Sequence, residues 1–154
     1  MGVFYDEGWP SSFSFSRSEG MAIEAEGVFE CETEEEVMFY DTDCGGVVHN
    51  LAYLRMIEKC RTRLAAGLGF ELREMGETGI FPVVVRTEVD YRKPAKLADV
   101  LVIKGWLSEW SKARFWCEFE VLRGEELLLT ARQSLALVKM PEGKVQRLGA
   151  LPSK

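Results

Sequence analysis

Apolar residues between positions 47 and 68 recur at steps of three and four along the chain. The repeat runs through Val47, Leu51, Leu54, Ile57, Cys60, Leu64 and Leu68. This spacing places apolar side chains on one face of a helix, and Gly67 and Gly69 are of the type at which helices end. The pattern therefore predicts one long helix whose broad apolar face requires a sheet packed against it.

Five other segments show the pattern of strands. Residues 34–43 read as a strand entering a loop, and residues 81–93, 99–110, 113–122 and 127–140 read as four further strands. In the segment 81–93, the alternation predicts one face with Val83, Val85, Thr87, Val89 and Tyr91, and the other with Arg86, Glu88 and Asp90. Short connections favour antiparallel neighbours. The predicted fold class is α+β, a curved antiparallel sheet wrapped around one long central helix.

The first 30 residues differ in composition from the rest. They are rich in Ser, Gly and scattered aromatic residues and have no steady periodicity. We interpret residues 1–30 as an N-terminal extension that is poorly ordered or loosely docked, and residues 31–154 as the folded domain. Its aromatic side chains leave the docked alternative open, because exposed aromatic side chains are costly in water.

Composition and charge exclude several classes of protein. The formal net charge is −6 and the pI is about 5.0, which argues against a nucleic-acid partner. The four cysteines form no C-x-x-C pair and there is one histidine, so we expect no metal site and read the cysteines as reduced thiols of a cytoplasmic protein. The N-terminus does not read as a signal peptide, and no stretch reaches the length of a membrane span.

Acidic residues, glycines and the single histidine meet where the predicted helix begins. Asp41, Thr42 or Asp43 could simply cap the helix, with Gly45 and Gly46 permitting a tight turn. Alternatively, a helix N-terminus with free N–H groups can hold an oxyanion, and a nearby carboxylate can attack a carbonyl carbon or activate water. That arrangement suits acyl transfer.

Two other candidate centres lie in the same stretch. His49 could act as a general base or could only hydrogen-bond to a neighbour. Cys44 with His49 could suggest a thiol nucleophile, although five residues of separation do not establish contact.

The same residues carry a resemblance to a known family. The stretch "FYDTDCGGVVHNLAYLRMIEKCRTRL", with its D-x-D turn, small residues, helix tyrosine and E-x-x-R step, resembles the hotdog-fold acyl-CoA thioesterases of the 4-hydroxybenzoyl-CoA thioesterase and YbgC-like branch. "VDYRKPAKLADVLVI", "EWSKARF" and "LGALP" extend the similarity over about residues 34–152.

This resemblance implies a fold, an assembly and a site. Protomers would pair into a dimer or a dimer of dimers, with the active site at the interface between protomers. Asp43 would be the catalytic carboxylate, as nucleophile or general base, and the backbone near Val48, His49 and Asn50 would receive the thioester oxygen. Substrate would contact Gly45, Gly46, Tyr53, Glu58, Lys112 and Arg114, the two basic residues lying where related enzymes bind the CoA phosphates. Lys112 and Arg114 could equally be solvated strand charges.

Two departures from the family pattern are visible. Relatives commonly carry Tyr and then His where this chain has His49 and Asn50, so the histidine is displaced by one position. Phe39 replaces a tyrosine often found before the D-x-D turn.

The predicted function is hydrolysis of an acyl-CoA thioester to free acid and CoA, without metal or redox cofactor. The alternatives are a non-catalytic module that binds acyl-CoA or acyl carrier protein, and a thioesterase acting on acyl carrier protein. An acidic chain disfavours an acidic carrier as partner.

Overall fold

One antiparallel sheet and one long helix make up most of the described chain. The computed structural model describes residues 29–151. The elements, in order, are β1 (Glu30–Glu36), the 3-10 turn η1 (Phe39–Asp41), α1 (Asn50–Gly67), α2 (Leu72–Thr78), β2 (Ile80–Tyr91), β3 (Val100–Trp110), β4 (Phe115–Arg123), β5 (Glu126–Lys139) and β6 (Lys144–Gln146). The sheet order is β1-β3-β4-β5-β2, and β6 pairs with β5. Every pairing is antiparallel, which confirms the predicted fold class.

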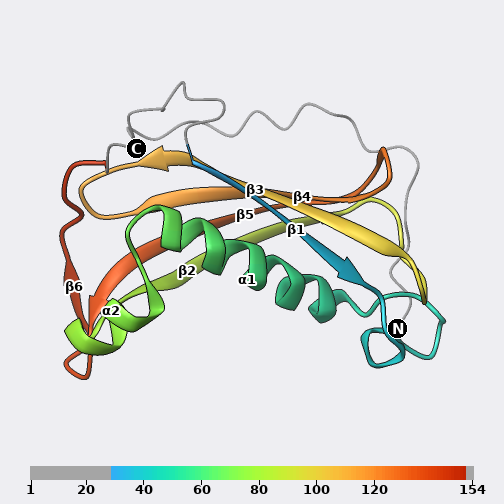
Figure 1. Cartoon of the computed structure of the whole chain (residues 1–154), viewed down its shortest axis with the longest axis horizontal. Coiled ribbons are helices and arrows are strands. Elements are labelled where there is room, and N and C mark those ends of the chain that lie inside the picture. The colour runs from blue at the N-terminus through green and yellow to red at the C-terminus, as the bar shows by residue number, and fades with distance from the viewer. Residues whose placement is uncertain (1–28, 152–154) are drawn as a thin grey trace.

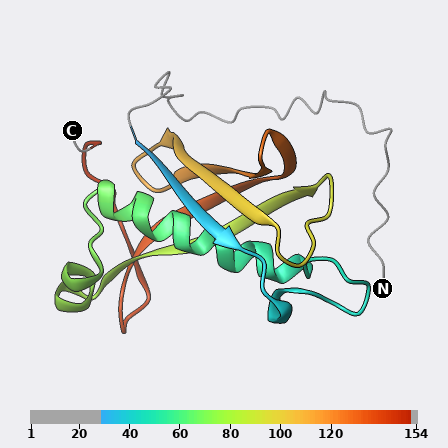
Figure 2. The same ribbon diagram turned by 45° about the vertical axis from the view of Figure 1, so that its right-hand side comes forward.

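The core lies between α1 and the face of the sheet that curves around it (Figures 1 and 2). The helix contributes the buried side chains Tyr53, Met56, Ile57, Cys60, Leu64 and Leu68. The sheet contributes Ile103, Phe115, Phe119, Val121, Leu129 and Leu135. Each fully buried side chain of this size contributes about 1.5–3 kcal/mol, so this face fixes where α1 lies on the sheet.

The start of the helix differs from the prediction. The helix begins at Asn50, so Val47 precedes it, and Leu51 is largely exposed. The buried face instead begins with Tyr53, and Ala52 before it is only partly buried against the core. The predicted end near Gly67 and Gly69 is confirmed, with Leu68 as the C-cap residue.

The predicted alternation along β2 is wrong in its first half. The register with β5 shifts between Val84 and Arg86, which is a β-bulge. A bulge inserts one extra residue and reverses the faces on either side of it. Val84, Val89 and Tyr91 consequently pack against the core, whereas Val83 and Val85 are 40% and 46% exposed.

Several elements and boundaries were not foreseen. The first strand ends at Glu36, and residues 39–41 form η1 in place of a strand. Neither α2 nor β6 was predicted; none of the α2 residues is buried, so α2 lacks an apolar stripe to reveal it. Phe29 is buried and β1 begins at Glu30, slightly before the predicted domain start. Residues 1–28, on which the predicted extension falls, lie outside the described part of the chain.

The two ends of α1 lie beside different sets of loops. At its N-terminal end lie the segment 37–49, the β2–β3 connection and the β4–β5 hairpin (Figure 1). At its C-terminal end lie α2, the β3–β4 connection and β6 (Figures 1 and 2). The acidic turn singled out in the sequence belongs to the first end.

Candidate active site

Asp43 lies in a tight turn that precedes α1. Its side chain is exposed, and its Oδ1 accepts a hydrogen bond from the Gly45 N–H at 2.8 Å. The Gly46 N–H donates to the Asp43 carbonyl at 3.0 Å, and the Asp43 N–H donates to the Val47 carbonyl at 2.9 Å. Gly46 has a φ of +74°, a conformation that favours glycine. Within residues 29–151, Oδ2 of Asp43 accepts no hydrogen bond, so half of the carboxylate is open to solvent.

Asp41 has the opposite environment, although it lies two residues away. It is 1% exposed. Its Oδ2 accepts a hydrogen bond from the Met38 N–H at 2.9 Å, and its Oδ1 accepts one from Nη2 of Arg55 at 3.1 Å. A buried carboxylate with these partners connects the loop to α1, which is a structural role. The two acidic residues of the D-x-D turn therefore lie in different environments, a distinction that the sequence did not reveal.

The helix N-terminus is capped by His49, whose Nδ1 accepts a hydrogen bond from the Leu51 N–H at 3.1 Å. The expectation that Asp41, Thr42 or Asp43 caps the helix is therefore wrong. The Thr42 hydroxyl donates to the Phe39 carbonyl at 2.8 Å, and both acidic side chains have the partners given above. Because Nδ1 of His49 accepts a backbone N–H, the imidazole has the cap role that the sequence left open.

The amides just before α1 and in its first turn are nearly all occupied. The Val48 N–H donates to the Ala95 carbonyl at 2.9 Å, and the His49 N–H donates to the Asp41 carbonyl at 2.7 Å. The Leu51 N–H reaches His49 Nδ1, and the Ala52 N–H donates to the His49 carbonyl at 2.9 Å. Among the hydrogen bonds of residues 29–151, none uses the Asn50 N–H. Of Val48, His49 and Asn50, it is Asn50 whose backbone donor is available to an oxygen atom.

Tyr53 is buried and lies behind this end of the helix. Its hydroxyl accepts a hydrogen bond from the Ala95 N–H at 2.8 Å. Its ring meets that of Tyr91 edge-on at 5.9 Å between centroids, and the Tyr91 hydroxyl donates to the Asn50 carbonyl at 3.1 Å. These contacts give Tyr53 a part in supporting the start of α1 from the core side.

Glu58 lies farther along α1 and is exposed. Its carboxylate is 3.6 Å from Nη2 of Arg61, whose Nη1 donates to Oε1 of Gln133 at 2.7 Å. Burial lowers the pKa of the Arg61 guanidinium. The E-x-x-R step thus includes a half-buried arginine that joins α1 to β5.

The structure does not bring Lys112 and Arg114 near Asp43 within one chain. Both lie in the β3–β4 connection, beside the C-terminal end of α1 (Figures 1 and 2). Their backbone carbonyls accept hydrogen bonds, from Leu148 to Lys112 and from Ser111 to Arg114. Within one chain, these two basic residues and Asp43 therefore lie beside opposite ends of α1.

The described residues also bear on metal binding, on the cysteines and on membranes. Between positions 29 and 151, no group of three or more His, Cys, Asp or Glu residues is arranged to hold a metal ion. All four cysteines are free thiols, and burial raises the pKa of both Cys60 and Cys117 to about 12. No helix in the described part of the chain is long and apolar enough to cross a membrane.

The sequence of this chain is similar to those of known thioesterases and esterases. Residues 37–150 match the family model of the thioesterase-like superfamily. The acyl-CoA thioesterase YbgC of Haemophilus influenzae is 33% identical over 109 residues, which cover 70% of this chain and 80% of that protein. A putative esterase of Aquifex aeolicus is 29% identical over 71% of this chain and 84% of its own length.

Solved structures agree in fold and in sequence. A probable thioesterase from Bartonella henselae is 32% identical, with a TM-score of 0.72 over 78% of this chain and 99% of that one. A 1,4-dihydroxy-2-naphthoyl-CoA thioesterase from Synechocystis is 25% identical, with a TM-score of 0.70 over 78% of this chain and 90% of that one. The match of the family model, the identities and the shared fold agree, and this chain therefore belongs to the thioesterase-like superfamily, among the YbgC-like, hotdog-fold acyl-CoA thioester hydrolases.

Proposed function

We propose that this protein hydrolyses an acyl-CoA thioester to the free acid and CoA, with Asp43 as the catalytic carboxylate and the Asn50 N–H as the oxyanion donor. The observation that carries the proposal is that the Asp43 turn has an open carboxylate oxygen and that the start of α1, next along the chain, has an unoccupied amide at Asn50. A helix N-terminus adds partial positive charge to that amide, which favours a developing oxyanion.

The steps follow from these two groups. The thioester carbonyl oxygen accepts the Asn50 N–H, which polarises the carbonyl carbon. Asp43 then either attacks that carbon, forming a mixed anhydride that water hydrolyses, or takes a proton from a water that attacks it. In both routes the carbon–sulfur bond breaks, and CoA leaves as a thiolate that is protonated by solvent. Gly45 and Gly46 present no side chain that would block the approach of the thioester.

A second protomer would complete the site. In the single chain, Asp43 is exposed and the side chains of Phe39 and Tyr40 beside it are 81% and 76% exposed. The edge strand β2 also exposes Val83 and Val85. Apolar surface of this kind supports an interface between protomers. In a dimer or a dimer of dimers, Lys112 and Arg114 of one protomer would bind the CoA phosphates of a substrate held at Asp43 of the other.

The location of the protein is a further part of the proposal. Four free thiols are typical of a reducing compartment, which supports the predicted cytoplasmic location.

The proposal is tested with a panel of short, long and aromatic acyl-CoAs and a readout for free thiol. Aromatic acyl-CoAs are included because one similar structure is that of a 1,4-dihydroxy-2-naphthoyl-CoA thioesterase. We expect turnover by the wild type, and a loss of kcat of about 10²- to 10⁴-fold in Asp43→Asn. Equal turnover by both proteins would remove Asp43 from the mechanism. Calorimetry that finds tight binding of acyl-CoA without turnover would identify the non-catalytic module instead.

Two measurements refine the proposal. Single turnover in ¹⁸O-labelled water places label in the Asp43 carboxyl group only if Asp43 is the nucleophile and water opens the mixed anhydride at the aspartyl carbon; general-base catalysis places all of the label in the product acid. Rates with acyl carrier protein thioesters as substrates, compared with the same acyl group on CoA, identify the carrier. We expect CoA to be preferred, because the chain is acidic.

A further inference from the structure

The loop that carries Asp43 is fastened at both of its ends by one short turn of the β2–β3 connection. At the start of the loop, the Val37 N–H donates to the Asp99 carbonyl and the Ala98 N–H donates to the Val37 carbonyl, each at 2.9 Å. At the end of the loop, Val47 forms a β-bridge with Lys96, and the Val48 N–H donates to the Ala95 carbonyl at 2.9 Å. The turn 95–99 therefore closes the base of the loop.

This turn does not have a relaxed backbone. Ala98 has a φ of +65°, in the left-handed region that residues other than glycine seldom adopt. Such a conformation persists where surrounding contacts enforce it, and it is concentrated at functional sites. The contacts that enforce it here come from Asp99, whose Oδ2 accepts the Lys96 N–H at 2.8 Å and whose own N–H donates to the Lys96 carbonyl at 3.1 Å.

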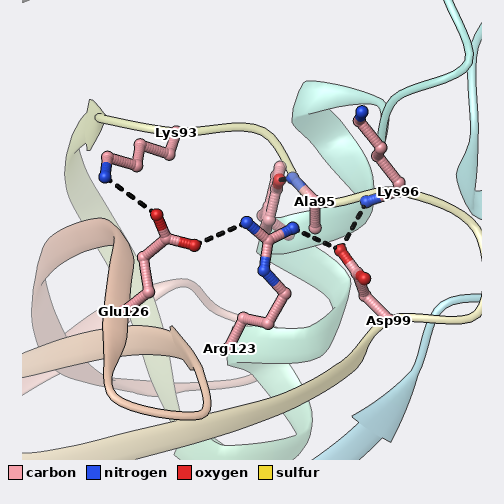
Figure 3. A network of polar contacts seen from close by, with 7 residues as sticks. Lys93, Ala95, Lys96, Asp99, Arg123 and Glu126 are labelled. Carbon is pink, nitrogen blue, oxygen red and sulfur yellow. Dashed lines mark hydrogen bonds and ion pairs between the residues drawn. The ribbon is translucent and has the colours of Figure 1, made fainter.

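Arg123 anchors the turn to the sheet (Figure 3). Its Nη1 donates to Oδ2 of Asp99 at 2.7 Å, and its Nη2 donates to Glu126 at 2.5 Å. Glu126 also accepts a hydrogen bond from Lys93 at 2.8 Å. Partial burial raises the pKa of Asp99, but the Lys96 amide and the Arg123 guanidinium outweigh it and bring the pKa below its usual value. Asp99 therefore stays ionised, and the β4–β5 hairpin holds the turn through a charged pair.

We propose that the turn Ala95–Asp99, anchored by Arg123, is a positioning clamp that sets the distance between the Asp43 carboxylate and the Asn50 amide. The clamp fixes Val37 on one side of the Asp43 loop and Val48 on the other, two residues before Asn50. Ala95 also donates to the Tyr53 hydroxyl inside the core, so the clamp is tied to α1 as well as to the sheet. Arg123 and Asp99 act through this backbone and not through contact with substrate. This inference rests on the proposed function.

The test compares Arg123→Gln with a matched control, Arg132→Gln. Arg132 is also a half-buried, ion-paired arginine of the sheet: it pairs with Glu109 and lies 4.0 Å above the Trp116 ring. Its strand neighbours Ala131 and Gln133 are buried, so its side chain lies on the face of the sheet opposite the core. For Arg123→Gln we expect kcat to fall about tenfold with KM within about twofold, because small misplacements of reacting groups are costly. For the control we expect kcat within about twofold of the wild type.

A second measurement, amide hydrogen exchange, tests the positioning clamp without relying on thioester hydrolysis. Amide hydrogen exchange at Val37 and Val48 is expected to speed up at least about tenfold in Arg123→Gln and to stay unchanged in Arg132→Gln. If the wild type hydrolyses no acyl-CoA, the proposed function fails and exchange alone decides the clamp. If Arg123→Gln does not fold, Arg123→Met is measured in its place, since methionine keeps an apolar stem but can pair with neither Asp99 nor Glu126. Unchanged exchange at both amides, or unchanged kcat in a folded Arg123 variant, would overturn the proposal.

Discussion

The Arg55 guanidinium and the Asp41 carboxylate meet at 3.1 Å, between the first turns of α1 and the loop that precedes it. Arg55 also lies 3.7 Å from Glu35 near the end of β1, so it connects the strand, the loop and the helix. The pair holds the backbone at Asp41, whose carbonyl accepts the His49 N–H. It therefore connects the backbone two residues before Asp43 to the first turns of α1.

Because the two side chains lie in such different environments, Asp41→Asn and Asp43→Asn should differ in their effect on stability. Asp41→Asn is expected to lower the free energy of unfolding by about 1–3 kcal/mol, because it removes the charge from a buried, hydrogen-bonded carboxylate. Asp43→Asn is expected to change it by less than about 0.5 kcal/mol, since Asp43 is exposed and asparagine can keep the bond to Gly45. Urea unfolding of both variants measures the difference. Equal destabilisation would contradict the separate roles.

The depressed pKa of Asp99 predicts an acid-dependent stability. A group whose pKa is lower in the folded protein stabilises it above the unfolded value, and that stabilisation is lost as the pH falls through the folded value. Asp99 has an ordinary pKa of 3.8, so the gap in unfolding free energy between wild type and Asp99→Asn should be constant from pH 5 to 8 and shrink below about pH 4. We expect a gap of up to about 1 kcal/mol, because the side chain is 22% exposed and solvent screens the pair. A gap that stays constant down to pH 2 would show that the charge of Asp99 is not what stabilises the turn.

Gly105 in β3 allows close packing under α1. A Cβ added there would lie 2.8 Å from Cδ1 and Cε1 of the Phe119 ring and 3.0 Å from Cys60 Sγ. Gly105→Ala is therefore expected to lower the free energy of unfolding by about 1–3 kcal/mol. The control is Gly76→Ala in α2, where a Cβ meets nothing within 4 Å; there we expect no loss, or a gain of up to about 1 kcal/mol from helix propensity. Thermal unfolding of both variants compares them, and a neutral Gly105→Ala would mean that Phe119 and Cys60 can move aside.

The cysteines should differ sharply in reactivity. Cys44 is exposed in the turn beside Asp43, whereas Cys60 and Cys117 are buried thiols whose pKa is raised to about 12. Because the thiolate is the reactive form, a maleimide at pH 7 is expected to label Cys44 first and to reach Cys60 and Cys117 only after unfolding. Mass spectrometry of the labelled peptides follows the order. Early labelling of Cys60 in the native protein would show that α1 opens readily from β3.

Periodicity in the sequence predicted the presence of the helix and of the strands β2 to β5, because burial of one face imposes that pattern directly. It failed at β2, where the bulge between Val84 and Arg86 reverses the faces while leaving the apolar residues in place. It also missed α2, in which none of the residues is buried. The bulge in β2 depends on its pairing with β5, which is distant in the chain. The helix α2 buries no residue, so its sequence has no apolar period.

The sequence by itself determined the fold class and placed acid, glycine and helix start next to one another, because these are local properties of spacing and residue type. Only the tertiary structure decided what each residue does there. Asp41 became structural through Arg55, which is fourteen residues away, and the Val48 amide was occupied by Ala95, which is farther still. A hydrogen bond between distant segments produces no periodic pattern in the sequence. Only the tertiary structure therefore shows that the Val48 and His49 amides have acceptors and that the Asn50 amide is available.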